Sequence, residues 1–151
     1  MDNNDIIDTL NLLIETSRDG DKGFTDCAHA SKDASLKAYF TICAARCRES
    51  VTALTSEVTR RGGSAETSGT VMAGAHRAWL DLTTALTSDN DLAVLEECER
   101  AEDVAKSAYI TALRAELPTE LRTLVQHQFD GVRENHDRVK KLRDDKKLVA
   151  A

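Results

Sequence analysis

Proline and aromatic residues are scarce in this sequence of 151 residues. It contains one proline, and its aromatic side chains are one tryptophan, two tyrosines and three phenylalanines. Folds with many strands need turn residues and runs of β-branched or aromatic residues, so the composition argues against them. A chain of this length fits a single domain, 1–151, and can bury a core without disulfides or metals.

Two other absences concern membranes and oxidising compartments. The chain starts Met-Asp-Asn-Asn-Asp, which is acidic and has no apolar segment, so we expect no signal peptide. No apolar run approaches the ~18 residues that a membrane span needs. The cysteines, Cys27, Cys43, Cys47 and Cys98, include no Cys-x-x-Cys pair, and we expect them to be reduced and buried. These features predict a cytoplasmic protein that has no membrane partner.

The charge pattern argues against nucleic acid as a partner. The formal net charge is −6, and charges of both signs make up 30% of the residues. The most basic stretch, RVKKLRDDKK (138–147), contains no interleaved aromatic residue and is interrupted by Asp144 and Asp145. Cations near the end of a helix complement its dipole, so we interpret this stretch as a solvated helical face.

What the sequence does contain is helical periodicity. Apolar and small residues recur at alternating spacings of four and three, which places them on one face of a helix. Single glycines inside the first helix, Gly20 and Gly23, weaken it by ~1 kcal/mol each without changing the phase of the pattern. The pattern predicts long helices over 4–31, 33–61, 90–116 and 118–147 and a shorter helix over 71–86.

Loop lengths arrange these helices. Asp33 is a good N-cap, Gly62 and Gly63 follow a basic helix end, and Leu117 precedes Pro118, where α geometry is disfavoured. The first and last connections are tight, so each joins antiparallel neighbours. The middle connection, with its own helix, is long enough to traverse the molecule. The sequence therefore predicts an all-α, ferritin-like antiparallel four-helix bundle with a long helical crossover between helices two and three.

Four stretches carry a resemblance to a known family: DIIDTLNLLIET (5–16), GAHRAWLDL (74–82), VLEECERAED (94–103) and NHDRVKKLRD (135–144). They are similar to bacterial ferritin-like four-helix-bundle proteins that are catalogued as a domain of unknown function. The resemblance extends over nearly the whole chain and implies a cytoplasmic bacterial bundle. It implies no reaction and no catalytic residues, so none are transferred.

A ferritin-like fold raises the question of a di-metal centre, which takes a carboxylate from each of two helices and a Glu-x-x-His motif from each of the other two. The residues three positions before His127 and His136 are Leu124 and Arg133, so neither forms this motif. The predicted second helix has no histidine. We therefore expect no cofactor, and iron or manganese is kept as an alternative.

Two polar residues nevertheless fall on predicted apolar faces, Glu102 and His136, and Glu99 lies at the edge of the same face as Glu102. An acid and an imidazole on facing helices could form half of a metal site. The alternative is a buried hydrogen-bonded pair that fixes helix register. On the crossover helix, His76 and Trp79 could form a ligand-facing lid, or Trp79 could anchor the crossover with His76 at its rim.

The leading hypothesis from sequence is a non-enzymatic helical-bundle protein that acts through self-assembly as a homo-oligomer or through an unidentified protein partner, with a stress role as an analogy to the ferritin-like class. The alternative is a metal-binding or redox protein with an atypical site around Glu99, Glu102 and His136. No catalytic residues are predicted.

Overall fold

The computed structural model describes residues 1–65, 73–88 and 90–150, and side chains in all of these except 73–76 and 150. In these ranges the chain forms helices α1 (Asn3–Ala30), α2 (Ala34–Arg60), α3 (Ala73–Ala85), the 3₁₀ helix η1 (Leu86–Ser88), α4 (Asp91–Arg114) and α5 (Thr119–Ala150). The described part of the chain is all-helical, as predicted. None of the described helices is long and apolar enough to cross a membrane.

Capping residues begin and end the helices where the sequence suggests. Asp2 forms a capping box with Asp5 at the start of α1, and the Asp33 carboxylate accepts hydrogen bonds from two backbone N–H groups at the start of α2. Asn90 caps α4 in the same way. Gly62 follows α2 with a φ of 82°, a conformation that glycine adopts without a steric penalty. Local chemistry therefore defines most of the helix boundaries.

The predicted boundaries need small corrections. α4 ends at Arg114, two residues before the predicted end, because Ala115 is extended just ahead of the Leu117-Pro118 pair. α5 continues to Ala150 since no glycine or proline stops it. The crossover helix ends at Ala85 and tightens into η1. Its predicted start at residue 71 lies outside the described residues.

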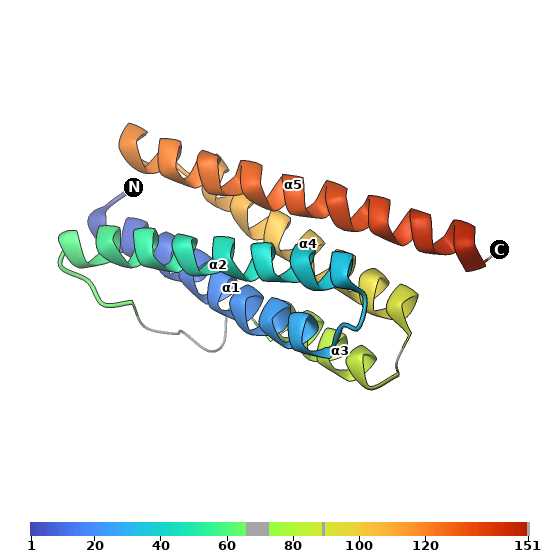
Figure 1. Ribbon diagram of the computed structural model, residues 1–151. Coiled ribbons are helices and arrows are strands. Elements are labelled where there is room, and N and C mark those ends of the chain that lie inside the picture. Colours follow the sequence, from blue (N-terminus) through green and yellow to red (C-terminus); the bar gives the residue numbers. More distant parts are fainter. Residues whose placement is uncertain (66–72, 89, 151) are drawn as a thin grey trace.

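The four long helices form a closed ring of neighbours. α1 packs along α2, α4 packs along α5, α1 also contacts α4, and α2 contacts α5 only sparsely. In Figure 1, α1 and α5 run in one direction, and α2 and α4 run in the other. α2 and α4 are therefore parallel, as the long middle connection predicted. α3 lies against α1 and α4.

Trp79 holds α3 against α1. Its indole is 6% exposed and meets the Phe24 ring edge-on, with 5.0 Å between ring centroids. Gly23 allows this approach, because a Cβ at that position would overlap the indole ring. The anchoring interpretation of Trp79 is thus the one that the contacts support, and the glycine that appeared only to weaken α1 makes room for α3. The His76 side chain lies outside the described side chains.

The buried apolar side chains form two separate cores. The α3-side core contains Phe24, Cys27, Ala28, Leu36, Tyr39, Phe40, Cys43, Ala44, Ala78, Trp79, Leu82, Val94, Leu95, Cys98, Ala101 and Val139. The N-terminal core contains Ile6, Leu10, Leu13, Ile14, Leu54, Val58, Tyr109, Ala112, Leu117, Leu121 and Val125. The two cores occupy opposite ends of the long helices, so the middle of the molecule is built differently.

Candidate functional site

A cleft occupies the middle of the molecule, between the two cores. Its volume is about 430 Å³, which is within the usual range for small-molecule sites. The lining includes exposed residues such as Glu49 and Glu134 and the buried Glu102, so the cleft runs from the surface into the interior. The residues that line it are Thr16, Ser17, Gly20, Phe24, Arg46, Cys47, Glu49, Ser50, Ala53, Trp79, Glu102, Ala105, Tyr109, Leu124, His127, Gln128, Asp130, Gly131, Val132, Glu134 and Asn135.

Small side chains and glycines create the space. Ser17, Gly20 and Ser50 stand on α1 and α2 where large apolar residues stand at either end of these helices. At Gly20 a Cβ would come within 2.7 Å of the Cys47 sulfur, so this glycine keeps α1 and α2 close. At Gly131 on α5, a Cβ would meet nothing within 4 Å. The side of the cleft that α5 forms therefore has free space at Gly131, and a larger side chain at this position would begin to fill the cleft.

Arg46 bridges the mouth of the cleft from α2 to α5. Its guanidinium donates to the Asn135 side-chain oxygen at 2.7 Å and to the Gly131 carbonyl at 3.4 Å, and it forms an ion pair with Glu134 at 3.2 Å. Because α2 and α5 otherwise touch sparsely, these contacts contribute much of the direct connection between them.

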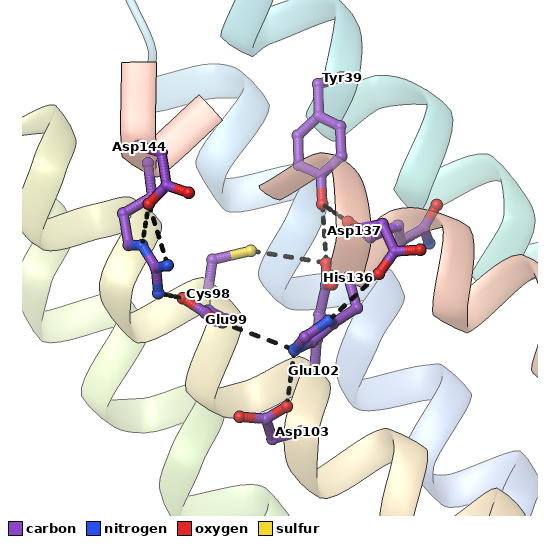
Figure 2. A network of polar contacts seen from close by, with 10 residues as sticks. Tyr39, Cys98, Glu99, Glu102, Asp103, His136, Asp137 and Asp144 are labelled. Atoms are coloured by element: carbon purple, nitrogen blue, oxygen red, sulfur yellow. Dashed lines mark hydrogen bonds and ion pairs between the residues drawn. The ribbon is translucent and has the colours of Figure 1, made fainter. Parts of the chain in front are cut away.

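Glu102 is the buried acid of the cleft. Its side chain is 2% exposed, and its Oε1 contacts the Tyr39 hydroxyl at 2.8 Å and the Cys98 thiol at 3.7 Å. Figure 2 shows both groups meeting at this carboxyl group. Among the described residues, the other oxygen, Oε2, is buried and has no hydrogen-bond partner. A buried oxygen without a partner carries a desolvation cost of roughly 1–3 kcal/mol, and this cost calls for an explanation.

The geometry around Tyr39 indicates that Glu102 is neutral. The Tyr39 oxygen lies 2.8 Å from Glu102 Oε1 and also 2.8 Å from the backbone carbonyl oxygen of Asn135. A phenol has one proton, and a backbone carbonyl only accepts hydrogen bonds. Both contacts are well-directed hydrogen bonds when Tyr39 donates to Asn135 and accepts from a proton on Glu102 Oε1. Oε2 is then a carbonyl-type oxygen that accepts hydrogen bonds.

Electrostatics point the same way. Burial disfavours the charged form and raises the pKa of Glu102 to about 8, helped by the nearby carboxylates of Asp103 and Glu99. Hydrogen bonds that Tyr39 and Cys98 donate to the ionised carboxylate favour the charged form and lower the pKa, but burial outweighs them. Glu102 is thus a carboxylic acid that changes its charge near neutral pH.

The thiols around Glu102 are chemically quiet. Burial raises the pKa of Cys27 and of Cys47 to about 12, and it raises the pKa values of Cys43 and Cys98 well above the ordinary range. A thiol that stays protonated is a poor nucleophile and a poor metal ligand. Among the described residues all four cysteines are free. Cys27, Cys43 and Cys98 are buried as predicted, whereas Cys47 is half-buried.

The other two candidate residues lie in a separate network nearer the surface. His136 Nε2 is 2.7 Å from Asp103 and 3.9 Å from Glu99, and its Nδ1 is 3.8 Å from Asp137. Glu99 also pairs with Arg143. Figure 2 shows this network beside the one around Glu102, and the contacts given for Glu102 and His136 involve different partners. The structure thus brings Glu99 together with His136 and places Glu102 in the cleft.

These residues do not fit a ferritin-like di-metal centre. Such a centre needs several inward-facing carboxylates and two histidines. Glu102 is accompanied by a phenol and a thiol, and the imidazole of His136 is already paired with Asp103. Within the described part of the chain, no group of three or more His, Cys, Asp or Glu residues is placed to hold a metal ion.

On the inner face of α5, apolar spacing alone does not identify every buried position. Phe129 and Val132 follow this spacing and are half-buried against the N-terminal core, whereas Gln128 and Asn135 are buried. The buried amides have specific partners: Gln128 accepts from the Tyr109 hydroxyl at 3.1 Å, and Asn135 accepts from Arg46. A polarity pattern cannot identify amides as inward-facing when their partners lie on helices that are distant in sequence.

The basic C-terminal stretch is also more than a solvated face. Lys146 lies 3.3 Å from the Asp33 carboxylate at the start of α2 and 3.4 Å from that of Asp91 at the start of α4. Arg143 pairs with Glu99 on α4. The last turns of α5 therefore form ion pairs with α4 and with the start of α2, in addition to the solvated face that the sequence predicts.

Fold and site together define a protein that is all-helical in its described part, with a central cleft lined by both apolar and polar side chains and a buried, neutral acid inside the cleft. The chain belongs to the family described as Domain of unknown function (DUF2383), whose model matches residues 5–115. This match confirms the resemblance to a family of unknown function, and it ends before α5, so the stretch 135–144 lies outside it. No protein in the curated collection matches the sequence significantly.

Proposed function

We propose that this protein is a non-enzymatic binding protein and that its partner is a small molecule held in the cleft between α2 and α5. The observation that carries the proposal is Oε2 of Glu102, a buried acceptor that has no partner within the described part of the chain and belongs to a residue that lines a cleft of about 430 Å³. A ligand that supplies a hydrogen-bond donor would satisfy this oxygen and remove its desolvation cost.

The lining supports binding in preference to catalysis. The aromatic faces of Phe24, Trp79 and Tyr109 and the side chains of Leu124 and Val132 offer apolar contact, and Glu102 with the buried amides offers a few oriented polar groups. This combination is typical of small-molecule sites. The buried thiols have raised pKa values, so they are not activated nucleophiles.

The finer expectations from sequence belong to this proposal. They are a ferritin-like topology, a bacterial cytoplasmic setting, a homo-oligomeric form, a stress role and independence from iron or manganese. The parallel arrangement of α2 and α4 supports the topology. Elemental analysis of protein purified without chelators, after growth with added iron and manganese, tests metal independence. Stoichiometric metal that is lost in Glu102→Ala would favour the metal-binding alternative.

Probe binding to the cleft tests the central proposal. Benzyl alcohol, a small aromatic donor, is titrated into ¹⁵N-labelled protein at millimolar concentration and followed by NMR. We expect saturable shifts of the amide signals of Ala105, Gln128 and Gly131, which line the cleft. Gly131→Leu places a side chain where a Cβ has no neighbour within 4 Å, so it should fill the cleft and abolish these shifts.

Thr123→Leu is the matched control, because it adds the same side chain to an exposed position of α5. Circular dichroism establishes that both variants fold. Saturable shifts in the wild type and Thr123→Leu but not in Gly131→Leu support the proposal. No saturable shift in the wild type, or equal shifts in Gly131→Leu, overturns it.

A further inference from the structure

We propose that the ligand of the cleft is a small organic cation, an ammonium group on an apolar body, and that its N–H donates to Oε2 of Glu102 while Glu102 releases its proton to solvent. The inference rests on the proposed function, since it assigns the chemical class of ligand for the same cleft. No covalent bond changes: one neutral carboxyl and one ammonium become an ion pair, and one proton leaves.

Hydrogen-bonding capacity is the first reason. Oε1 is engaged by Tyr39 and Cys98, while Oε2 is an acceptor without a partner. The terminal torsion angle χ3 of a glutamate side chain has a broad distribution, so a modest rotation of the carboxyl group can direct Oε2 toward the cleft. A ligand therefore has to bring a donor to this position. An ammonium group brings three donors and no acceptor.

Charge at the mouth of the cleft is the second reason. Three carboxylates line it, those of Glu49, Asp130 and Glu134, against one guanidinium, that of Arg46, which is already paired with Glu134. The protein as a whole carries a net charge of −6. A field of this sign attracts cations and repels anions. An anionic ligand would also meet Glu102 without a cation beside it in the contacts that the structure gives.

Shape is the third reason. The inner surface carries the aromatic side chains Phe24, Trp79 and Tyr109, and the cleft is bounded by the small residues Gly20 and Gly131. An ammonium group is attracted to the faces of aromatic rings as well as to a carboxylate. A compact alkyl or aromatic amine satisfies all three features at once, whereas a bare inorganic cation would leave the apolar lining without contacts.

Proton release follows from the state of Glu102. Since its pKa is about 8 in the protein, it is largely neutral at pH 7, and pairing with an ammonium group favours the ionised form. Groups on α1, α2 and α4 interact electrostatically with this carboxyl group. They are Cys27 on α1, Tyr39, Cys43 and Cys47 on α2, and Cys98, Glu99 and Asp103 on α4. The charged groups Arg46 on α2 and Asp130 and Glu134 on α5 line the same cleft.

Isothermal titration calorimetry with three matched probes tests the inference. Benzylamine is cationic between pH 6 and 8, benzyl alcohol is neutral, and benzoate is anionic, on similar apolar bodies. We expect benzylamine to bind at least tenfold more tightly than benzyl alcohol at pH 8, and benzoate not to bind. With a pKa of about 8, affinity for benzylamine should rise roughly ninefold from pH 6 to 7 and about fivefold from pH 7 to 8.

Proton release is measured from the same titrations in two buffers of different ionisation enthalpy. About 0.9 proton should leave per benzylamine bound at pH 7. Glu102→Gln should lose both the proton release and the preference for the amine while still binding the alcohol. His136→Gln is the control, because His136 belongs to the separate network with Asp103 and Glu99, and this variant should keep the proton release.

The outcomes separate the two proposals. If none of the three probes binds, the proposed function fails. If benzyl alcohol binds as tightly as benzylamine, or benzoate binds more tightly, the cleft is a binding site but the cation inference is wrong. Amine binding without proton release also overturns the inference. These readouts on the wild-type protein decide the question even if Glu102→Gln does not fold.

Discussion

The two ends of this molecule and its middle follow different rules of construction. At the ends, large apolar side chains such as Leu10, Leu82 and Leu95 are completely buried in cores to which four or five helices contribute. In the middle, the buried polar residues Thr16, Ser17, Glu102, Gln128 and Asn135 surround a cleft, and glycines replace bulky side chains. The same four helices thus provide stability at their ends and leave room for binding at their centre.

The comparison shows how a helical protein can contain a site without a catalytic motif. The ends supply the hydrophobic stabilisation, at roughly 25 cal/mol for each Å² of apolar surface buried. The middle contributes less, and its buried acid lacks one hydrogen-bond partner. Functional sites are commonly the places where local stability is sacrificed. The predictions below test this division, from the largest expected effect to the smallest.

The largest effect concerns the charge of Glu102. Its folded pKa, about 8, lies above its ordinary value of 4.5, so the folded state binds a proton that the unfolded state releases. The contribution of Glu102 to the free energy of unfolding should therefore be greatest below about pH 4.5. Between about pH 4.5 and pH 8 it should fall by up to about 1.4 kcal/mol per pH unit. Urea unfolding of the wild type and Glu102→Gln across this range measures it. Parallel pH profiles in the two proteins would contradict the assignment.

The next effect contrasts two glycines. Gly23→Ala places a Cβ against the buried Trp79 ring and should destabilise the protein by about 1–3 kcal/mol, or displace α3. Gly131→Ala adds a methyl group to the open cleft in α5 and should stabilise by about 0.5–1 kcal/mol through helix propensity. Denaturant unfolding with Trp79 fluorescence detects both the change in stability and any movement of α3. If both substitutions changed the free energy of unfolding equally, the proposed difference between the tightly packed end and the open middle of the molecule would be wrong.

Two valines on α5 provide a matched comparison of packing. Val139 is fully buried in the α3-side core, and Val132 is half-buried at the cleft. Val139→Ala should cost about 2 kcal/mol, because it removes buried methyl groups and leaves a cavity. Val132→Ala should cost well under 1 kcal/mol, since its side chain already borders open space. The contrast is wrong if the two free energies of unfolding change equally.

The smallest effect is expected at the end of α5. Lys146→Met keeps much of the aliphatic chain and removes the charge that pairs with Asp33 and Asp91. Partly exposed pairs of this kind stabilise weakly, and salt screens them. The variant should melt slightly below the wild type at low ionic strength, and the difference should vanish in about 1 M salt. Lys140→Met, at an exposed position of α5 with no such pair among the described contacts, is the control.

Much of this fold could be predicted from particular residues. Asp33, Gly62 and Pro118 lie at helix boundaries because capping and the absence of a proline N–H are local effects. The apolar spacing of Ile6, Leu10 and Leu13 on α1 predicted burial correctly. The site was less predictable. Glu102 is identified because an acid stands among apolar residues, but the sequence does not show whether it meets His136.

The sequence by itself determined the helices, their lengths and the chemical character of the buried acid, because these depend on residues a few positions apart. Only the tertiary structure decided which side chains meet at Glu102. The Tyr39 hydroxyl on α2 contacts Glu102, which lies 63 residues further along the chain, and the carbonyl of Asn135 on α5, which lies 96 residues further along. The rotation of each helix about its own axis sets these contacts, and half-buried positions such as Phe129 and Val132 leave that rotation open. Packing at the two ends fixes it, and the cleft in the middle results.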